Sequence, residues 1–168
     1  MEISRRAARW VPIVAALLVS AVLAPACGAY VVAPAPPPTE PTPPGAAKVC
    51  IVRTGTDGAL STFPVRDNGI LVGATVGGSC FCYFAAQGHH ELEARSDGYD
   101  TLSIDFAAGK EHFIVQAARG AVGIVRSHLE EMGEDEGRVA MKACQYHVLT
   151  AVPDGTYKAK PGMVVVAK

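Results

Sequence analysis

The chain has 168 residues, a formal net charge of −1 and 49% hydrophobic residues. This length allows one domain with a modest core, and the lack of a basic cluster argues against nucleic acid as a partner. Only one apolar run approaches membrane-spanning length, and it lies at the start of the chain.

Residues 1–26 have the pattern of a signal peptide. Three arginines precede an apolar run over residues 10–23, and the small residues 24–26 stand directly before Cys27. This arrangement resembles the lipobox of bacterial lipoproteins, in which the cysteine becomes lipid-modified and then N-terminal, although Leu23 sits one place early. We therefore expect acylation of Cys27. Ordinary secretion after Ala-Pro-Ala and an uncleaved anchor are the alternatives.

Residues 27–47 predict a proline-rich tether. Seven prolines lie between Pro34 and Pro44. Because proline fixes φ and removes the backbone donor, we expect an extended polyproline II segment outside any sheet. At about 3.1 Å per residue, such a spacer would hold a domain some tens of ångströms from a membrane.

Residues 48–152 predict a β-domain. Segments 90–95 and 101–106 alternate apolar and polar residues, the pattern of a strand with one buried face. The pair Asn68-Gly69 between apolar runs predicts a hairpin with a type I′ turn. Further strands are expected over residues 49–53, 60–66, 70–72, 80–84, 112–116 and 122–129. This spacing, with glycine-containing turns, indicates an antiparallel β-sandwich or an open barrel.

One helix is expected near the end of the domain, over residues 134–147. Its first three residues are acidic, which suits a helix N-terminus. A helical face is formed by Gly137, Met141, Cys144 and Val148. We expect this face to lie on the sandwich. Residues 153–168 would form a terminal strand or a tail, and their valine run favours pairing because an exposed run would promote aggregation.

Short turn motifs recur along the predicted domain. They are Asp-Asn-Gly-Ile-Leu-Val-Gly at 67–73, Gln-Gly-His-His-Glu-Leu at 87–92 and Gly98-Tyr99, with segments 108–115 and 136–144 extending the series. Together they resemble the PEGA-type repeat, as found in a family of small bacterial lipoproteins whose domain has no assigned function. The resemblance covers about Lys48 to Cys144 and departs from the pattern at Ala86-Gln87, where two prolines are usual. It implies a PEGA-like, prealbumin- or immunoglobulin-like sandwich in the cell envelope, and it supplies no catalytic residues.

Four cysteines remain besides Cys27: Cys50, Cys80, Cys82 and Cys144. An even number in an exported chain favours two disulfides, with three possible connectivities. A bridge between Cys80 and Cys82 is the least attractive, because extended neighbours at i and i+2 are near the limit of unstrained geometry. We predict that Cys144 bonds to Cys80 or Cys82, which would attach the helix to the sheet.

A metal site is the alternative use of these cysteines. Cys80 and Cys82 share one face of their predicted strand, and His89 and His90 follow across the next turn. Two thiolates and an imidazole could bind zinc or copper. Since His89 and His90 alternate faces, only one of them, taken as His90, could point at the thiols. The spacing matches no established metal motif.

The sequence has no signature of an enzyme: it lacks a G-x-S-x-G elbow, a phosphate-binding glycine loop and an H-E-x-x-H motif. We therefore predict no catalytic residue and no cofactor. The favoured function is that of a lipoprotein of the bacterial cell envelope, in the outer membrane and facing the periplasm. It would be held to the membrane by its lipid and bind an envelope protein or glycan. A periplasmic metal-handling protein is the alternative.

Overall fold

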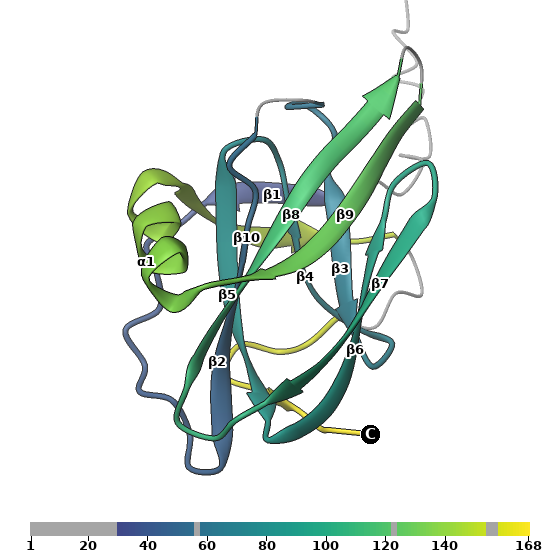
Figure 1. Cartoon of the computed structure of the whole chain (residues 1–168). Coiled ribbons are helices and arrows are strands. Elements are labelled where there is room, and N and C mark those ends of the chain that lie inside the picture. The colour runs from purple at the N-terminus through teal and green to yellow at the C-terminus, as the bar shows by residue number, and fades with distance from the viewer. Residues whose placement is uncertain (1–29, 56–57, 122–123, 154–157) are drawn as a thin grey trace, which may run out of the picture.

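The computed structural model describes residues 30–55, 58–121, 124–153 and 158–168 (Figure 1). The predicted signal peptide and Cys27 lie outside these ranges. Within them, no helix is both long enough and apolar enough to cross a bilayer. As predicted, the protein is mainly β, and its strands form two sheets.

The larger sheet has seven strands in the order β1-β10-β5-β2-β8-β9, with β11 also pairing with β5. Their bounds are β1 Val31–Pro34, β2 Ala46–Val52, β5 Ser79–Ala86, β8 Glu111–Ala121, β9 Ile124–Met132, β10 Gln145–Ala151 and β11 Val164–Val165. The smaller sheet has the order β4-β3-β6-β7. Its strands are β3 Phe63–Asp67, β4 Ile70–Thr75, β6 Gly88–Arg95 and β7 Tyr99–Phe106.

The two sheets share one hydrophobic core. Val49 and Ile114 of the larger sheet and Val65, Leu92 and Ala94 of the smaller sheet are fully buried members of one cluster. The β3–β4 hairpin turns at Asn68 and Gly69, whose φ angles are 49° and 82°. Positive φ at both central residues is the requirement of the predicted type I′ turn.

The prediction of a purely antiparallel sandwich is corrected in the larger sheet. There β2 pairs in parallel with β8, and β5 pairs in parallel with both β10 and β11. Each parallel pair is reached by a long crossover, as parallel strands require. Alternation along a strand reports which face is buried and contains no information on the direction of the neighbouring strand, so the sequence pattern could not reveal these pairs.

Both ends of the proline-rich segment pair with the larger sheet, whereas residues 36–41 between them are exposed. β1 pairs in antiparallel fashion with β10, the amide of Ala35 donates to the carbonyl of Tyr146 at 3.0 Å, and β2 begins at Ala46. This corrects the prediction of a tether outside the sheet at Val31–Pro34 and at Ala46 and Ala47, whereas residues 35–45 form no strand. The physical reason is that β1 is an edge strand with its single proline at its end, Pro34, where a missing donor is tolerated.

The helix α1, Glu134–Ala143, ends before residue 147. Cys144 already has an extended backbone, with φ −86° and ψ 156°, and β10 starts at Gln145. Val148 therefore belongs to a strand, and its side chain is 42% exposed. Val148 has the sequence spacing of a helical face, but the helix cannot continue to it because β10 pairs with β5 from its first residue, Gln145.

Gly137 allows α1 to lie directly on β8. A Cβ atom at this position would come within 2.1 Å of the ring of Phe113. Alanine usually stabilises a helix relative to glycine by about 1 kcal/mol. Here we expect Gly137→Ala to lower the free energy of unfolding by about 1–3 kcal/mol, because the ring has to move. Urea titration measures the change. Gly133→Ser is the control, since nothing lies within 4 Å of that position; a stabilised Gly137→Ala variant would contradict the close contact.

Candidate functional site

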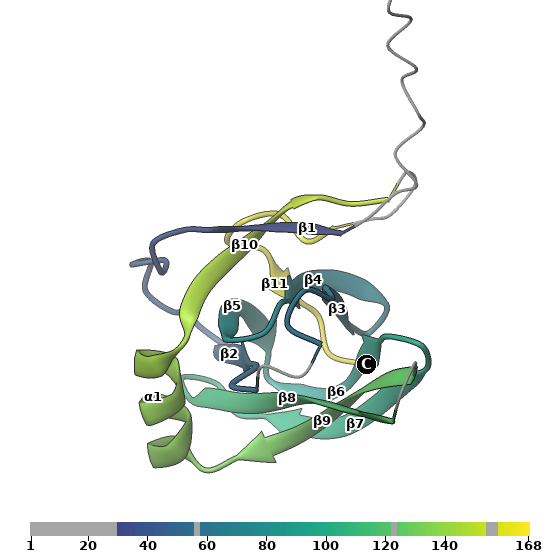
Figure 2. The same cartoon turned by 90° about the horizontal axis from the view of Figure 1, so that it is seen from above.

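One edge of β5 is shared by two strands that do not meet. β10 pairs with the start of β5 at Ser79 and Cys80, and β11 pairs with its end at Phe84 and Ala85. Between these two pairings, the same edge of β5 has no partner among the strands that the structure describes. The opening lies at the side of the sandwich, and Figure 2 shows β11 between β10 and β4.

The C-terminal segment, residues 158–163, closes this opening. The amide of Ala159 donates to the carbonyl of Leu71 in β4 at 2.8 Å, and a few residues later Val164 pairs with Phe84 in β5. The segment therefore spans from the smaller sheet to the larger one. The predicted pairing of the terminal valine run is observed here, because Val164 and Val165 form β11.

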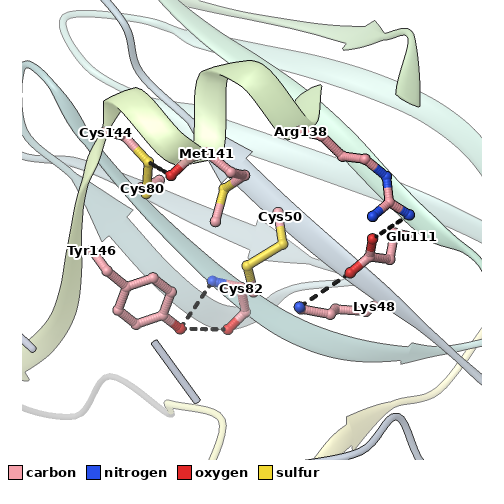
Figure 3. Close-up of a disulfide and its surroundings, with 9 residues drawn as sticks. All are labelled: Lys48, Cys50, Cys80, Cys82, Glu111, Arg138, Met141, Cys144 and Tyr146. Carbon is pink, nitrogen blue, oxygen red and sulfur yellow. Dashed lines mark hydrogen bonds and ion pairs between the residues drawn. A yellow bond between two sulfur atoms is a disulfide. The ribbon is translucent and has the colours of Figure 1, made fainter. Parts of the chain in front are cut away.

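The side chain of Tyr146 hydrogen-bonds to the backbone of β5 at the point where no strand pairs with it. Its hydroxyl accepts a hydrogen bond from the amide of Cys82 at 3.2 Å and lies 3.4 Å from the carbonyl of the same residue (Figure 3). Burial raises the pKa of Tyr146, so the hydroxyl keeps its proton and can donate it to that carbonyl. Buried backbone groups without partners are costly, and this side chain takes the place of a strand at the middle of the opening.

A cavity of about 240 Å³ occupies the opening. Small-molecule sites usually measure about 300–1,000 Å³, so the volume suits a small ligand. The surface is mainly apolar. It is lined by side chains that include Pro36, Pro38, Val72, Phe81, Phe84, Leu149 and Met163. Phe81 can lie against β4 because Gly73 has no side chain: a Cβ atom there would come within 2.4 Å of the ring.

Charged residues at this cavity are predominantly lysines. Lys48 forms an ion pair with Glu111, with 3.2 Å between the charged atoms. The ammonium of Lys158 donates to the carbonyl of Leu149. Lys160 is exposed, and its side chain has no partner among the residues that the structure describes. Glu40 is the one carboxylate in the described lining.

Two disulfides lie next to the opening (Figure 3). Cys50 and Cys82 are opposite each other in the antiparallel β2–β5 pair, with their Cα atoms 4.1 Å apart. Since the backbone of Cys82 faces Tyr146 and not β2, this is a non-hydrogen-bonded pair, the type with the closest side chains. The other disulfide joins Cys80 to Cys144, directly after α1. Of the two partners predicted for Cys144, the structure has Cys80.

The structure does not assemble the hypothetical metal site. The sulfurs of Cys80 and Cys82 are in separate disulfides, whereas His90 belongs to the other sheet. With the disulfides intact, these residues have no thiolate to offer a metal. Among the described residues, no group of three or more histidine, cysteine and acidic side chains is arranged to hold an ion.

His90 instead belongs to a buried polar cluster that the sequence reasoning missed. Its Nδ1 lies 2.7 and 2.9 Å from the two carboxylate oxygens of Asp67, and the hydroxyl of Tyr83 donates to Asp67 at 3.0 Å. The side chains of Asp67 and His90 are fully buried. A signal was present in the sequence, because His90 shares a strand face with the core residues Leu92 and Ala94.

The cluster joins the two sheets, because Asp67 and His90 lie in β3 and β6 and Tyr83 lies in β5. Burial raises the pKa of both Asp67 and Tyr83. The Nε2 atom of His90 is 3.0 Å from the carbonyl of Ala86, so both nitrogens of the imidazole face protein groups. We interpret the cluster as structural, since neither Asp67 nor His90 has surface that a substrate could contact.

The hydroxyl of Tyr83 should make stability depend on alkaline pH. Its folded-state pKa is raised well above the ordinary value of 10.0, first by burial and then by Asp67. The stability that it contributes is therefore fully present below about pH 10 and is lost as the pH rises through the folded-state pKa. Tyr83→Phe should lower the free energy of unfolding at pH 7 by about 1–2 kcal/mol and reduce the alkaline loss. Urea titrations from pH 7 to 11 test this. Tyr99→Phe, at a residue that is 77% exposed, is the control, and equal alkaline slopes for wild type and Tyr83→Phe would contradict the prediction.

Comparisons of this chain with protein-family models, with curated proteins and with solved structures gave no match. The resemblance to the PEGA-type repeat therefore rests on the turn motifs of the sequence alone.

Proposed function

We propose that the protein is a lipid-anchored lipoprotein of the bacterial cell envelope that acts as a binding module without catalysis. Its binding site is the cavity between β5, β10 and the C-terminal segment, and that cavity is the observation that carries the proposal. The anchor is a lipid on Cys27, and the location is the outer membrane, facing the periplasm. The signal-peptide pattern of residues 1–26 supports export and the anchor, and Gly28 after the modified cysteine is compatible with outer-membrane sorting.

The state of the polar groups around the cavity supports binding and not reaction. The hydroxyl of Tyr83 donates to Asp67, the hydroxyl of Tyr146 is used by the backbone of Cys82, and Lys48 is paired with Glu111. What remains available to a ligand is chiefly apolar surface, which contributes affinity when it is buried.

The domain is further proposed to be a PEGA-like sandwich. The motif at residues 67–73 forms the β3–β4 hairpin with the positive φ angles that its sequence requires. The motif at residues 87–92 provides most of β6, in the same sheet. Both motifs thus lie in the smaller sheet, where they determine turns and strand register.

The anchor and the site can be tested separately. Protein extracted from native membranes should have the intact mass of a chain that begins at Cys27 and carries acyl groups. A secreted product with a free thiol at Cys27 would refute the anchor.

For the site, the mature chain with Cys27→Ser is titrated with glycan, peptide and lipid fractions of the envelope while its amide NMR spectrum is followed. We expect shift changes concentrated at Val72, Leu149 and Met163, and their loss in Val72→Trp, which places a large side chain at the cavity. Changes confined to other surfaces, or none with any fraction, would refute the cavity as the binding site.

A further inference from the structure

We propose that the cavity binds a single-chain anionic amphiphile, with its apolar chain in the opening of β5 and its head group beside the lysines of the C-terminal segment. This inference rests on the proposed function, because it specifies the ligand of the same site. It follows from the shape of the opening, from the charges around it and from the polar groups that are already occupied.

The shape suits a short chain. The opening runs along β5 from Phe81 to Phe84, and its other walls include Leu149 and Met163. At about 30 Å³ for a group of the size of a water molecule, 240 Å³ holds roughly eight such groups. An alkyl chain of about eight carbons therefore matches the volume, and its burial against aromatic and aliphatic side chains is favourable.

The charges favour a negative head group. Lys158 and Lys160 lie on the segment that closes the opening, and neither has a carboxylate partner among the described residues. Glu40 opposes them with one negative charge, whereas the charge of Lys48 is already balanced by Glu111. Within the described lining, two unbalanced cations against one carboxylate leave a net positive rim, which attracts an anion and repels a cation.

The hydrogen bonding argues against a sugar as the occupant. A glycan offers many hydroxyl groups, each of which loses its water on entering a cavity and needs a partner there. The two tyrosine hydroxyls of the lining are already bonded, to Asp67 and to the backbone of Cys82. A hydrocarbon chain has no polar groups and therefore needs no hydrogen-bond partners in the cavity.

Three probes with the same chain length and different head groups test the proposal. Octanoate, octanol and octyltrimethylammonium are titrated calorimetrically into the mature chain with Cys27→Ser and both disulfides intact. We expect octanoate to bind with a dissociation constant below about 1 mM, at least about tenfold more tightly than octyltrimethylammonium, with octanol between them. Raising the salt concentration should reduce this difference.

Substitutions at the rim should change octanoate affinity in opposite directions. Lys160→Gln should weaken octanoate binding about two- to fivefold, the size expected for an exposed charge, and leave octanol unchanged. Glu40→Gln should strengthen it. The matched control is Lys142→Gln, at an exposed lysine on α1, which should have no effect.

Equal affinity for the three probes, or equal effects of Lys142→Gln and Lys160→Gln, would overturn the proposal. So would octanoate binding that persists in Val72→Trp. If no probe binds while envelope fractions still shift the cavity amides, the ligand class is wrong and the proposed function stands. If neither binds there, both are wrong.

Discussion

Asp67→Ala should lower the free energy of unfolding by about 2–6 kcal/mol, because leaving each of two buried hydrogen-bonding groups without its acceptor costs about 1–3 kcal/mol. The substitution leaves the imidazole of His90 and the hydroxyl of Tyr83 buried without their shared acceptor. It also removes the hydrogen bond between Asp67 of β3 and Tyr83 of β5, which connects the two sheets. Urea or thermal unfolding at pH 7 measures the loss.

The protein contains a matched control for this prediction. His89, one position along from His90 on β6, has its Nδ1 atom 3.3 Å from a carboxylate oxygen of Asp105, but the two side chains are 51% and 80% exposed. Because solvent screens an exposed pair, Asp105→Ala should change stability little. Similar losses for the two substitutions would show that Asp67 is not in a buried cluster.

Replacing both Cys80 and Cys144 with serine should cost about 4 kcal/mol. The two cysteines are 64 residues apart in the sequence. Closing a loop of this length lowers the entropy of the unfolded chain, which stabilises the folded state by about 4 kcal/mol. The disulfide also attaches the end of α1 to β5, so the amide protons of α1 should exchange faster in the variant. Denaturant titration and hydrogen exchange measure the two effects.

The other disulfide provides the comparison. Cys50 and Cys82 are separated by 32 residues, and the same relation gives a slightly smaller loss for the double serine variant. Exchange in α1 should change much less there, because this disulfide joins two strands and not the helix. Exported wild-type protein should show no free thiols at these four cysteines before reduction. Four free thiols would contradict both disulfides and revive the metal-handling alternative.

Local sequence patterns predicted the elements of this fold better than the relations between them. The alternation in residues 90–95 and 101–106 correctly located β6 and β7, and Asn68-Gly69 correctly located their neighbouring hairpin. The parallel partners of β5 could not be read in the same way, because pairing direction depends on segments far apart in the chain. The cavity could not be predicted for the same reason, because it is formed where β10 and β11 pair with different parts of one edge of β5.

Two residue types misled the sequence reasoning in instructive ways. The prolines predict a segment without sheet structure, which holds for residues 35–45 but not for β1, whose proline lies at the end of an edge strand. The sequence makes His90 a candidate metal ligand, whereas in the structure its partner is a carboxylate in the adjacent strand β3. The disulfide of Cys144 was easier to predict, since a helix packed on a sheet brings its end close to a strand and the candidates were few.

The pairing of β1 with β10 would limit where a lipid-anchored form of this protein could search for ligands. If Cys27 carries the lipid, only residues 28–30 separate the anchor from β1. At about 3.6 Å per residue, Val31 then stays within about 14 Å of the acylated residue. A domain held so close would stay at the bilayer surface and move over it by lateral diffusion. Molecules that partition into the membrane surface are concentrated in that thin layer, whereas a partner far out in the surrounding compartment would be beyond its reach.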